Sequence, residues 1–114
     1  MLRRLSDRIY VEIDAKIRKS NDNVNCVIKN ISEDYILSET SPDGKNIDLS
    51  PGSRLYIEFE THSGEFLSLP CVVFWSKKAY PDSLITTFCP KIEEKSPEYE
   101  DLYKDLFITN KEIY

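Results

Sequence analysis

The sequence predicts a mainly β domain, namely a small six-stranded antiparallel β-barrel with one C-terminal α-helix. Four segments alternate apolar and polar residues with the period of two that is typical of half-buried strands, and two shorter apolar segments complete a set of six. Short polar connections join most of them, and the last segment repeats its apolar residues at the spacing of an amphipathic helix. Antiparallel strands followed by a single helix favour a barrel whose open end or flank the helix covers.

Length and composition bound the kind of protein. The 114 residues are expected to form a single domain, 1–114, without a linker or repeat. With 40% hydrophobic and 31% charged residues, the chain fits neither the disordered nor the collagen-like class. A net charge of −5 argues against general binding to DNA or RNA duplexes, which requires a broad basic face. No apolar run resembles a membrane span or a signal peptide, so a cytoplasmic protein without membrane insertion is expected.

The predicted barrel covers residues 9–90. Its first strand is 9–19, and one face of that strand carries Val11, Ile13, Ala15 and Ile17. The turn SNDN leads to a second strand, whose inward positions are Val24, Cys26 and Ile28. A short third strand is expected over 35–39, and the loop TSPDGKNIDLSPGS follows it.

The remaining strands are predicted over 54–60, 65–75 and 83–90. In the fifth, one face is expected to carry Leu67, Leu69, Cys71, Val73 and Trp75. Pro70 interrupts this strand, and because proline cannot donate to a ladder we expect it at an edge or a bulge. The turn KKAYPD separates the fifth strand from the sixth, which is rich in β-branched and aromatic residues.

The C-terminal segment predicts a helix over 96–109. Ser96 is a good N-cap and Pro97 fits the first helical position. The apolar stripe that would dock on the sheet consists of Tyr99, Leu102, Tyr103, Leu106 and Phe107.

The cysteines and the single histidine give no catalytic or metal-binding pattern. Cys26, Cys71 and Cys89 are widely separated and lack the paired spacings of zinc or redox motifs, which favours reduced thiols. Cys26 and Cys71 are expected to be small buried hydrophobes, while Cys89 falls near a strand end. His62 sits in a polar turn without a recognisable triad or metal partner. We therefore expect no enzyme, no metal and no cofactor.

The N-terminal stretch MLRRLSDR is an arginine arm within an acidic chain. Arg3, Arg4 and Arg8 precede the first strand, so residues 1–8 are expected to be flexible and able to wrap. Guanidinium groups bind phosphate oxygens bidentately and stack on planar bases, a combination that suits a nucleotide ligand. The alternative is a solvated basic terminus without a ligand.

A second polar pair follows the second strand. In the stretch NIS, Asn30 and Ser32 lie two residues apart and on the same side of an extended backbone. Their amide and hydroxyl have the donors and acceptors needed to bind the edge of a base. The alternative use of these residues is an Asx or Ser turn that connects two strands.

Together these segments resemble the PilZ domain family over nearly the whole chain. The first motif of that family is an arginine, three residues and another arginine, often with an arginine ahead; RRLSDR matches it through Arg3, Arg4 and Arg8. The second motif is Asp or Asn, any residue, Ser, two residues and Gly, and NISEDY matches it at Asn30 and Ser32. The segments LSPGSRLYIEF, CVVFW and the closing helix are also similar to the family.

The resemblance implies a receptor for the bacterial second messenger cyclic di-GMP. It implies that Arg4 and Arg8 contact phosphates and stack on guanines with help from Arg3, and that Asn30 and Ser32 read a guanine edge. It further implies that the arm becomes ordered on the ligand and signals to an unidentified protein partner. We expect the chain itself to be a monomer or weak dimer.

The chain departs from the second motif at Tyr35, which stands where the family has glycine. Glycine serves positive φ angles and close approach of the backbone to a ligand, and a tyrosine disfavours both. Tyr35 therefore either narrows the site, or marks a PilZ-like adaptor that binds no nucleotide, or stacks on a guanine. A small barrel that binds single-stranded nucleic acid is disfavoured, because outside the arm the basic residues are interleaved with acidic ones.

Overall fold

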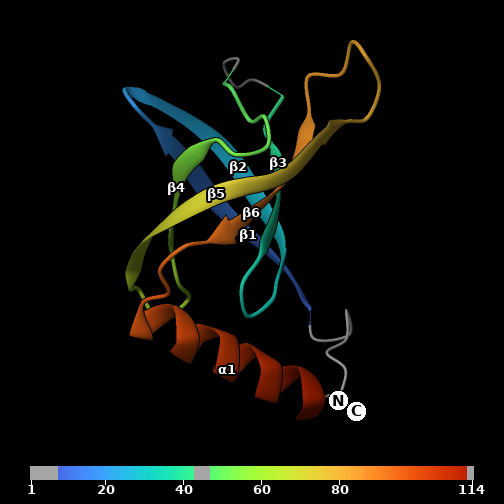
Figure 1. Ribbon diagram of the computed structural model, residues 1–114. Coiled ribbons are helices and arrows are strands. Elements are labelled where there is room, and N and C mark those ends of the chain that lie inside the picture. Colours follow the sequence, from blue (N-terminus) through green and yellow to red (C-terminus); the bar gives the residue numbers. More distant parts are fainter. Residues whose placement is uncertain (1–7, 43–46, 113–114) are drawn as a thin grey trace.

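A computed structural model describes residues 8–42 and 47–112, with the backbone alone described from 110 to 112. Within these residues the chain forms a closed antiparallel barrel in the order β1-β2-β3-β6-β5-β4, with one helix after it (Figure 1). The elements are β1 (Ile9–Lys19), β2 (Asp22–Ile31), β3 (Ile36–Thr40), β4 (Arg54–Glu60), β5 (Phe66–Lys78), β6 (Thr86–Ile92) and α1 (Pro97–Glu112). This architecture confirms the predicted fold class.

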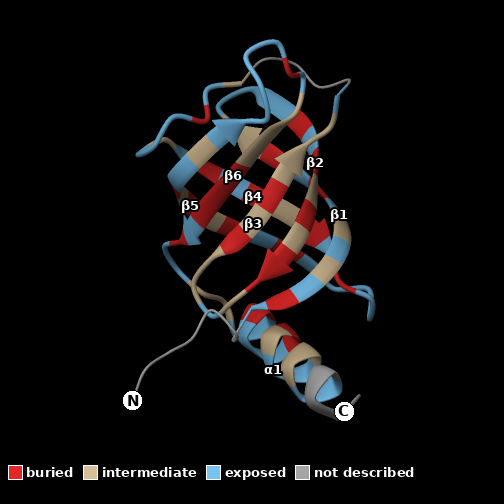
Figure 2. Cartoon of the chain, turned by 90° about the vertical axis from the view of Figure 1, so that its right-hand side faces the viewer, coloured by how far each residue is buried: buried red, intermediate tan, exposed pale blue. Residues whose placement is uncertain are grey.

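The barrel core contains the inward residues of every strand. Buried and exposed residues alternate along the strands, as Figure 2 shows in red and pale blue. Fully buried apolar side chains include Ile17, Ile28, Ile57, Leu69 and Phe88. Each such side chain contributes about 1.5–3 kcal/mol when it leaves water. The predicted inward positions Cys26 and Cys71 are buried as free thiols, and burial raises the pKa of each to about 12.

Trp75 does not face the core, contrary to the prediction. The pairing of β5 with β6 shifts register between Val73 and Trp75, which is the signature of a β-bulge. Beyond the bulge the alternation is reversed, so Ser76 lies opposite the fully buried Phe88. Phe74 and Trp75 are consequently 59% and 39% exposed.

Pro70 lies at a local edge of the β5–β6 ladder. It stands opposite Tyr56 of β4 but one residue before Cys71, where the pairing with β6 begins. Its carbonyl accepts a hydrogen bond of 2.8 Å from the N–H of Glu93, just after β6 ends. The N–H that proline lacks would therefore point beyond the end of the β5–β6 ladder, where no strand pairing needs it.

Strand β6 begins later and ends later than the predicted 83–90. Ser83 closes the preceding turn: its N–H donates to the Tyr80 carbonyl over 2.9 Å, and its hydroxyl donates to the Ile85 carbonyl over 3.1 Å. Because these bonds hold Ser83 in the loop, pairing starts at Thr86 and runs on to Ile92. Likewise β3 begins at Ile36, and Tyr35 forms an isolated bridge to Lys91.

Helix α1 lies across one end of the barrel (Figure 1). The Tyr99 N–H donates to the Ser96 hydroxyl over 3.2 Å, which confirms the predicted N-cap. Tyr99 is fully buried and Leu102 is 6% exposed, and both belong to the core. The Tyr99 hydroxyl donates a bond of 2.6 Å to the Ser32 carbonyl, in the turn between β2 and β3. Burial raises the pKa of Tyr99, so this donor keeps its proton.

The Tyr99–Ser32 hydrogen bond is expected to stabilise the fold measurably. Tyr99→Phe removes the donor and should lower the free energy of unfolding by about 1–2 kcal/mol in urea titrations. The control is Tyr10→Phe on β1, where the side chain is 77% exposed, and it should change stability by less than about 0.5 kcal/mol. Equal unfolding midpoints for Tyr99→Phe and the unaltered chain would contradict this account.

Candidate functional site

The residues of the second motif lie on the outside of the barrel, where β2, β3, β6 and β5 adjoin. Asn30 of β2 stands opposite Leu37 of β3. The register that joins Ser38 to Phe88 and Tyr35 to Lys91 places Leu37 opposite Cys89 of β6. Cys89 in turn stands opposite Trp75 of β5. We call the surface made by Asn30, Tyr35, Trp75, Cys89 and Lys91 the motif face.

Asn30 points outward although it is 4% exposed. Its neighbour Ile31 is fully buried in the core, and adjacent residues of a strand point to opposite sides. A register shift between Ile28 and Asn30 in the pairing with β3 allows both Ile28 and Asn30 to be buried, on different sides of the strand. The Asn30 amide is thus held at the base of the motif face.

Ser32 builds the turn after β2, as the turn interpretation of NIS predicts. Its N–H donates to the Tyr35 carbonyl over 2.9 Å, and the Tyr35 N–H donates to the Ser32 hydroxyl over 3.1 Å. The Ser32 hydroxyl in turn donates to the Tyr35 carbonyl over 3.4 Å. Ser32 therefore sets the direction of the turn, and its hydroxyl already serves the backbone.

The same turn is fastened to the rest of the molecule. The Ile92 N–H donates to the Asp34 carbonyl over 2.8 Å, and the Lys95 ammonium lies 3.0 Å from the Asp34 carboxylate. The hydrogen bond to Asp34 is the main cause that raises the pKa of Lys95. With the Tyr99 hydroxyl bonded to Ser32, the turn is held by both β6 and α1. This corner of the motif face is preorganised.

Tyr35 occupies the motif's glycine position without backbone strain. Among the described residues, positive φ angles occur at Ser20, Gly52 and Gly64, so Tyr35 has an ordinary backbone conformation. Its half-buried ring lies against Phe74, with ring centroids 5.4 Å apart and an interplanar angle of 55°. The Tyr35 ring therefore lies against β5 on the outer side of the barrel, and the Tyr35 backbone pairs with Lys91.

Arg8 is exposed and comes immediately before β1. Burial raises the pKa of the Cys89 thiol, and the positive charge of Arg8 partly offsets this rise. The pairing of β1 with β2 joins Ile9 to Ile31 and Tyr10 to Asn30, so Arg8, which precedes Ile9, lies near the Asn30 edge of the motif face. The predicted site residues Arg3 and Arg4 lie outside the described residues.

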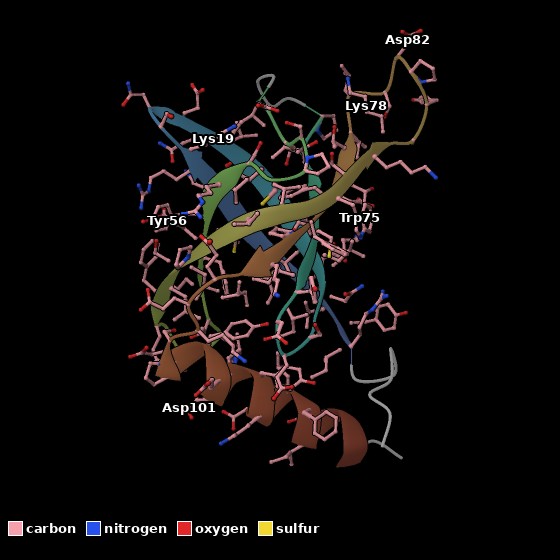
Figure 3. All side chains as sticks on the ribbon, viewed as in Figure 1. Lys19, Tyr56, Trp75, Lys78, Asp82 and Asp101 are labelled. Carbon is pink, nitrogen blue, oxygen red and sulfur yellow. The ribbon has the colours of Figure 1, made fainter. Side chains whose placement is uncertain are left out.

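Two residues of the motif face escaped the sequence reasoning. Trp75 was assigned to the core because strict alternation has no signal for the bulge at Val73. Lys91 follows the predicted end of the last strand, yet it is exposed and opposite Tyr35. Figure 3 shows Trp75 on the outer side of the barrel. A cation and an indole ring thereby join the amide of Asn30.

Other surfaces are chemically less specific. A groove of about 470 Å³ separates β1 and the β4–β5 turn from α1, and its lining includes Ile13, His62 and Leu106 but no residue of the motif face. In the part of the chain that the structure describes, no cluster of His, Cys, Asp or Glu is arranged to hold a metal ion. The described helix is also not long and apolar enough to cross a membrane.

Comparisons with known proteins give a family and a fold. A family model for the PilZ domain matches residues 2–99. Among solved structures, the chain is similar to the inhibitor of motility MotI/DgrA of Bacillus subtilis, with a TM-score of 0.73 and 17% sequence identity. The likeness covers 97% of this chain and 52% of the other, so the chain spans about half the length of that protein. No match is found among the curated proteins.

The position of Arg8 predicts an effect on cysteine reactivity. Replacing Arg8→Gln removes the charge that lowers the pKa of Cys89, so less thiolate forms and alkylation by iodoacetamide should slow at mildly alkaline pH. Mass spectrometry of the peptides separates Cys89 from Cys26 and Cys71, which should stay unlabelled in the folded chain. The control Lys16→Gln, on an exposed position of β1, should leave the rate unchanged. An unchanged rate in Arg8→Gln would show that Arg8 does not act on Cys89.

Proposed function

Because the chain belongs to the PilZ domain family, we propose that it binds cyclic di-GMP on the motif face and acts as an adaptor toward a protein partner. One observation carries the proposal. Arg8 of the first motif immediately precedes the point where β1 pairs with the Asn30 end of β2, next to the face on which the register brings together Asn30, Tyr35 and Lys91. Residues far apart in the sequence thus supply a cation, an amide and an aromatic ring to one surface.

The charge of this surface suits a ligand with two phosphates. Arg8 and Lys91 are both exposed, in a chain whose net charge is −5. Guanidinium groups form bidentate, charge-assisted hydrogen bonds to phosphate oxygens, whereas a lysine acts as a point charge. Arg4 and Arg3 of the arm would add to this set when the arm folds over the ligand.

The uncharged part of the surface suits a purine. The Asn30 side chain has an amide donor and acceptor for the edge of a guanine. Trp75 and Tyr35 offer aromatic faces, and stacking of a base on such a face contributes about 1–3 kcal/mol. Ser32 contributes mainly by holding the turn, because its hydroxyl is bonded to Tyr35.

Signalling would follow from the ordering of the arm. In this proposal the ligand phosphates neutralise Arg4 and Arg8, and the arm binds over the ligand on the motif face. Another protein then recognises the surface that the arm and the motif face form together. The turn at Ser32 and Asp34 is held by hydrogen bonds and an ion pair, which supports its role as a fixed platform for the ligand in this proposal.

A second candidate is a PilZ-like adaptor that binds no nucleotide. The contact between the Tyr35 and Phe74 rings favours it, since this pair fills space that the motif glycine leaves open in the family. The two candidates share the fold and the partner protein, and they differ in whether the motif face admits a ligand.

Isothermal titration with cyclic di-GMP tests the first candidate. The unaltered chain should release heat, and Arg4→Ala and Arg8→Ala should each weaken binding by about 10- to 100-fold, since a hydrogen bond to a charged group contributes about 1.5–3 kcal/mol. Lys16→Ala is the control, because it removes an exposed positive charge of β1 away from the motif face. Equal loss in the control and in Arg8→Ala would point to nonspecific electrostatics instead of a site.

A substitution at Tyr35 separates the two candidates. If the ring narrows the site, Tyr35→Gly should bind cyclic di-GMP more tightly than the unaltered chain, whereas Tyr35→Phe, which keeps the ring, should bind as the unaltered chain does. Heat from Tyr35→Gly alone would identify an adaptor whose site is closed by the ring. If neither the unaltered chain nor Tyr35→Gly binds, the nucleotide proposal is wrong. Weaker binding by Tyr35→Gly would instead assign a stacking role to the ring.

A further inference from the structure

Exposed apolar side chains concentrate on the hairpin formed by β5 and β6. Eight large hydrophobic residues of the described chain are exposed, and four of them fall on the distal part of this hairpin, between positions 74 and 84: Phe74 at 59%, Trp75 at 39%, Tyr80 at 57% and Leu84 at 74%. The hairpin projects beyond the barrel on the side away from α1 (Figure 1). Scattered apolar residues on a surface need no explanation, but such a cluster marks an interaction site.

The tip of the hairpin is ordered by its own hydrogen bonds. Ser83 is 6% exposed and binds the Tyr80 and Ile85 backbone, as described above. The Thr86 N–H donates to the Thr40 hydroxyl over 2.9 Å, which fixes the hairpin to β3. Tyr80 and Leu84 on either side of Ser83 are thus held in the open by the fold, and a preformed surface loses less entropy on binding.

The charge of the hairpin is basic where the chain as a whole is acidic. Lys77 is exposed on the same side of β5 as Trp75, and Lys78 is exposed on the other side. Figure 3 shows Lys78 toward the projecting end together with Asp82. Between positions 74 and 84, all of which the structure describes, two lysines therefore stand against one carboxylate. This arrangement attracts carboxylates and repels other basic surfaces.

We infer that this hairpin surface, which is the projecting end of the hairpin with Phe74, Trp75, Lys77, Lys78, Tyr80 and Leu84 on its two sides and at its tip, docks a segment of a partner protein that presents apolar side chains flanked by Asp or Glu. Aromatic anchors in the centre and charged residues at the rim are the usual anatomy of a protein interface. An anionic membrane would call for a larger basic cluster, on the order of 4–8 Lys or Arg residues.

The hairpin surface adjoins the motif face. Phe74 touches Tyr35, and Trp75 belongs to both surfaces. A ligand on the motif face would therefore lie next to the docked segment. This coupling rests on the proposed function, whereas docking itself needs no nucleotide.

A random-peptide phage library panned on the immobilised full chain tests the docking surface. Enriched peptides should combine Leu, Phe or Trp with Asp or Glu, and should not enrich on Tyr80→Ser/Leu84→Ser. In fluorescence polarisation without nucleotide, Lys77→Glu/Lys78→Glu should weaken the best peptide roughly tenfold or more. The control Lys16→Glu on β1 should leave its affinity unchanged. Equal enrichment on the Tyr80→Ser/Leu84→Ser chain, or equal affinity in Lys77→Glu/Lys78→Glu, would overturn the inference.

Two further measurements decide between occupants. Sedimentation velocity that shows self-association lost in Lys77→Glu/Lys78→Glu would assign the surface to a second copy and overturn the inference. Binding to phosphatidylserine vesicles that is lost in the same variant would assign it to a membrane, with the same consequence. Because nucleotide titration depends on Arg8 and peptide binding on the hairpin, failure of one proposal is distinguishable from failure of the other.

Discussion

Closure of the barrel between β3 and β6 is the constraint on which the other features depend. The two strands are neighbours in space but far apart in the sequence, and β3 has only five residues. Their pairing is supplemented on both sides by the bridge of Tyr35 to Lys91 and by the bond from the Thr86 N–H to the Thr40 hydroxyl. Without the pairing of β3 with β6, Asn30 and Trp75 would lie near opposite edges of an open sheet. The residues of the motif face would then not form one surface next to the first motif.

The pairing of β3 with β6 also explains why the turn after β2 serves to position the motif face and not to bind a ligand directly. Asp34 and Ser32 present their carbonyls to Ile92 and Tyr99, so β6 and α1 hold the turn from two directions. A buried tyrosine hydroxyl, with its pKa raised by burial, is a reliable donor at such a junction. The helix thereby covers the end of the barrel and also steadies the residues that flank the motif face.

Local patterns were sufficient to predict the elements, since the alternation of strands and the stripe of the helix express which side chains leave water. Ser96 and Pro97 predicted the start of α1 correctly, because the capping of a helix depends on a few adjacent residues. The motif face was only partly accessible to such reasoning. Asn30 and Tyr35 were found through their motif, but the placement of Lys91 depends on a register between distant strands. Trp75 was misassigned because a bulge leaves no trace in residue type, and the hydroxyl of Ser32 fits both a turn and a ligand.

The bulge in β5 reverses which residues of the strand face inward and which face outward. Before it, even-numbered positions such as Pro70 and Val72 face outward; after it, odd-numbered positions such as Lys77 do. In a lineage of such domains, loss or gain of a single residue here would exchange the inward and outward positions of β5 beyond the bulge, while β6 keeps its own alternation. A change of length by one residue at this point would therefore alter which β5 side chains are exposed on the hairpin, while the sequence of the barrel core stays the same.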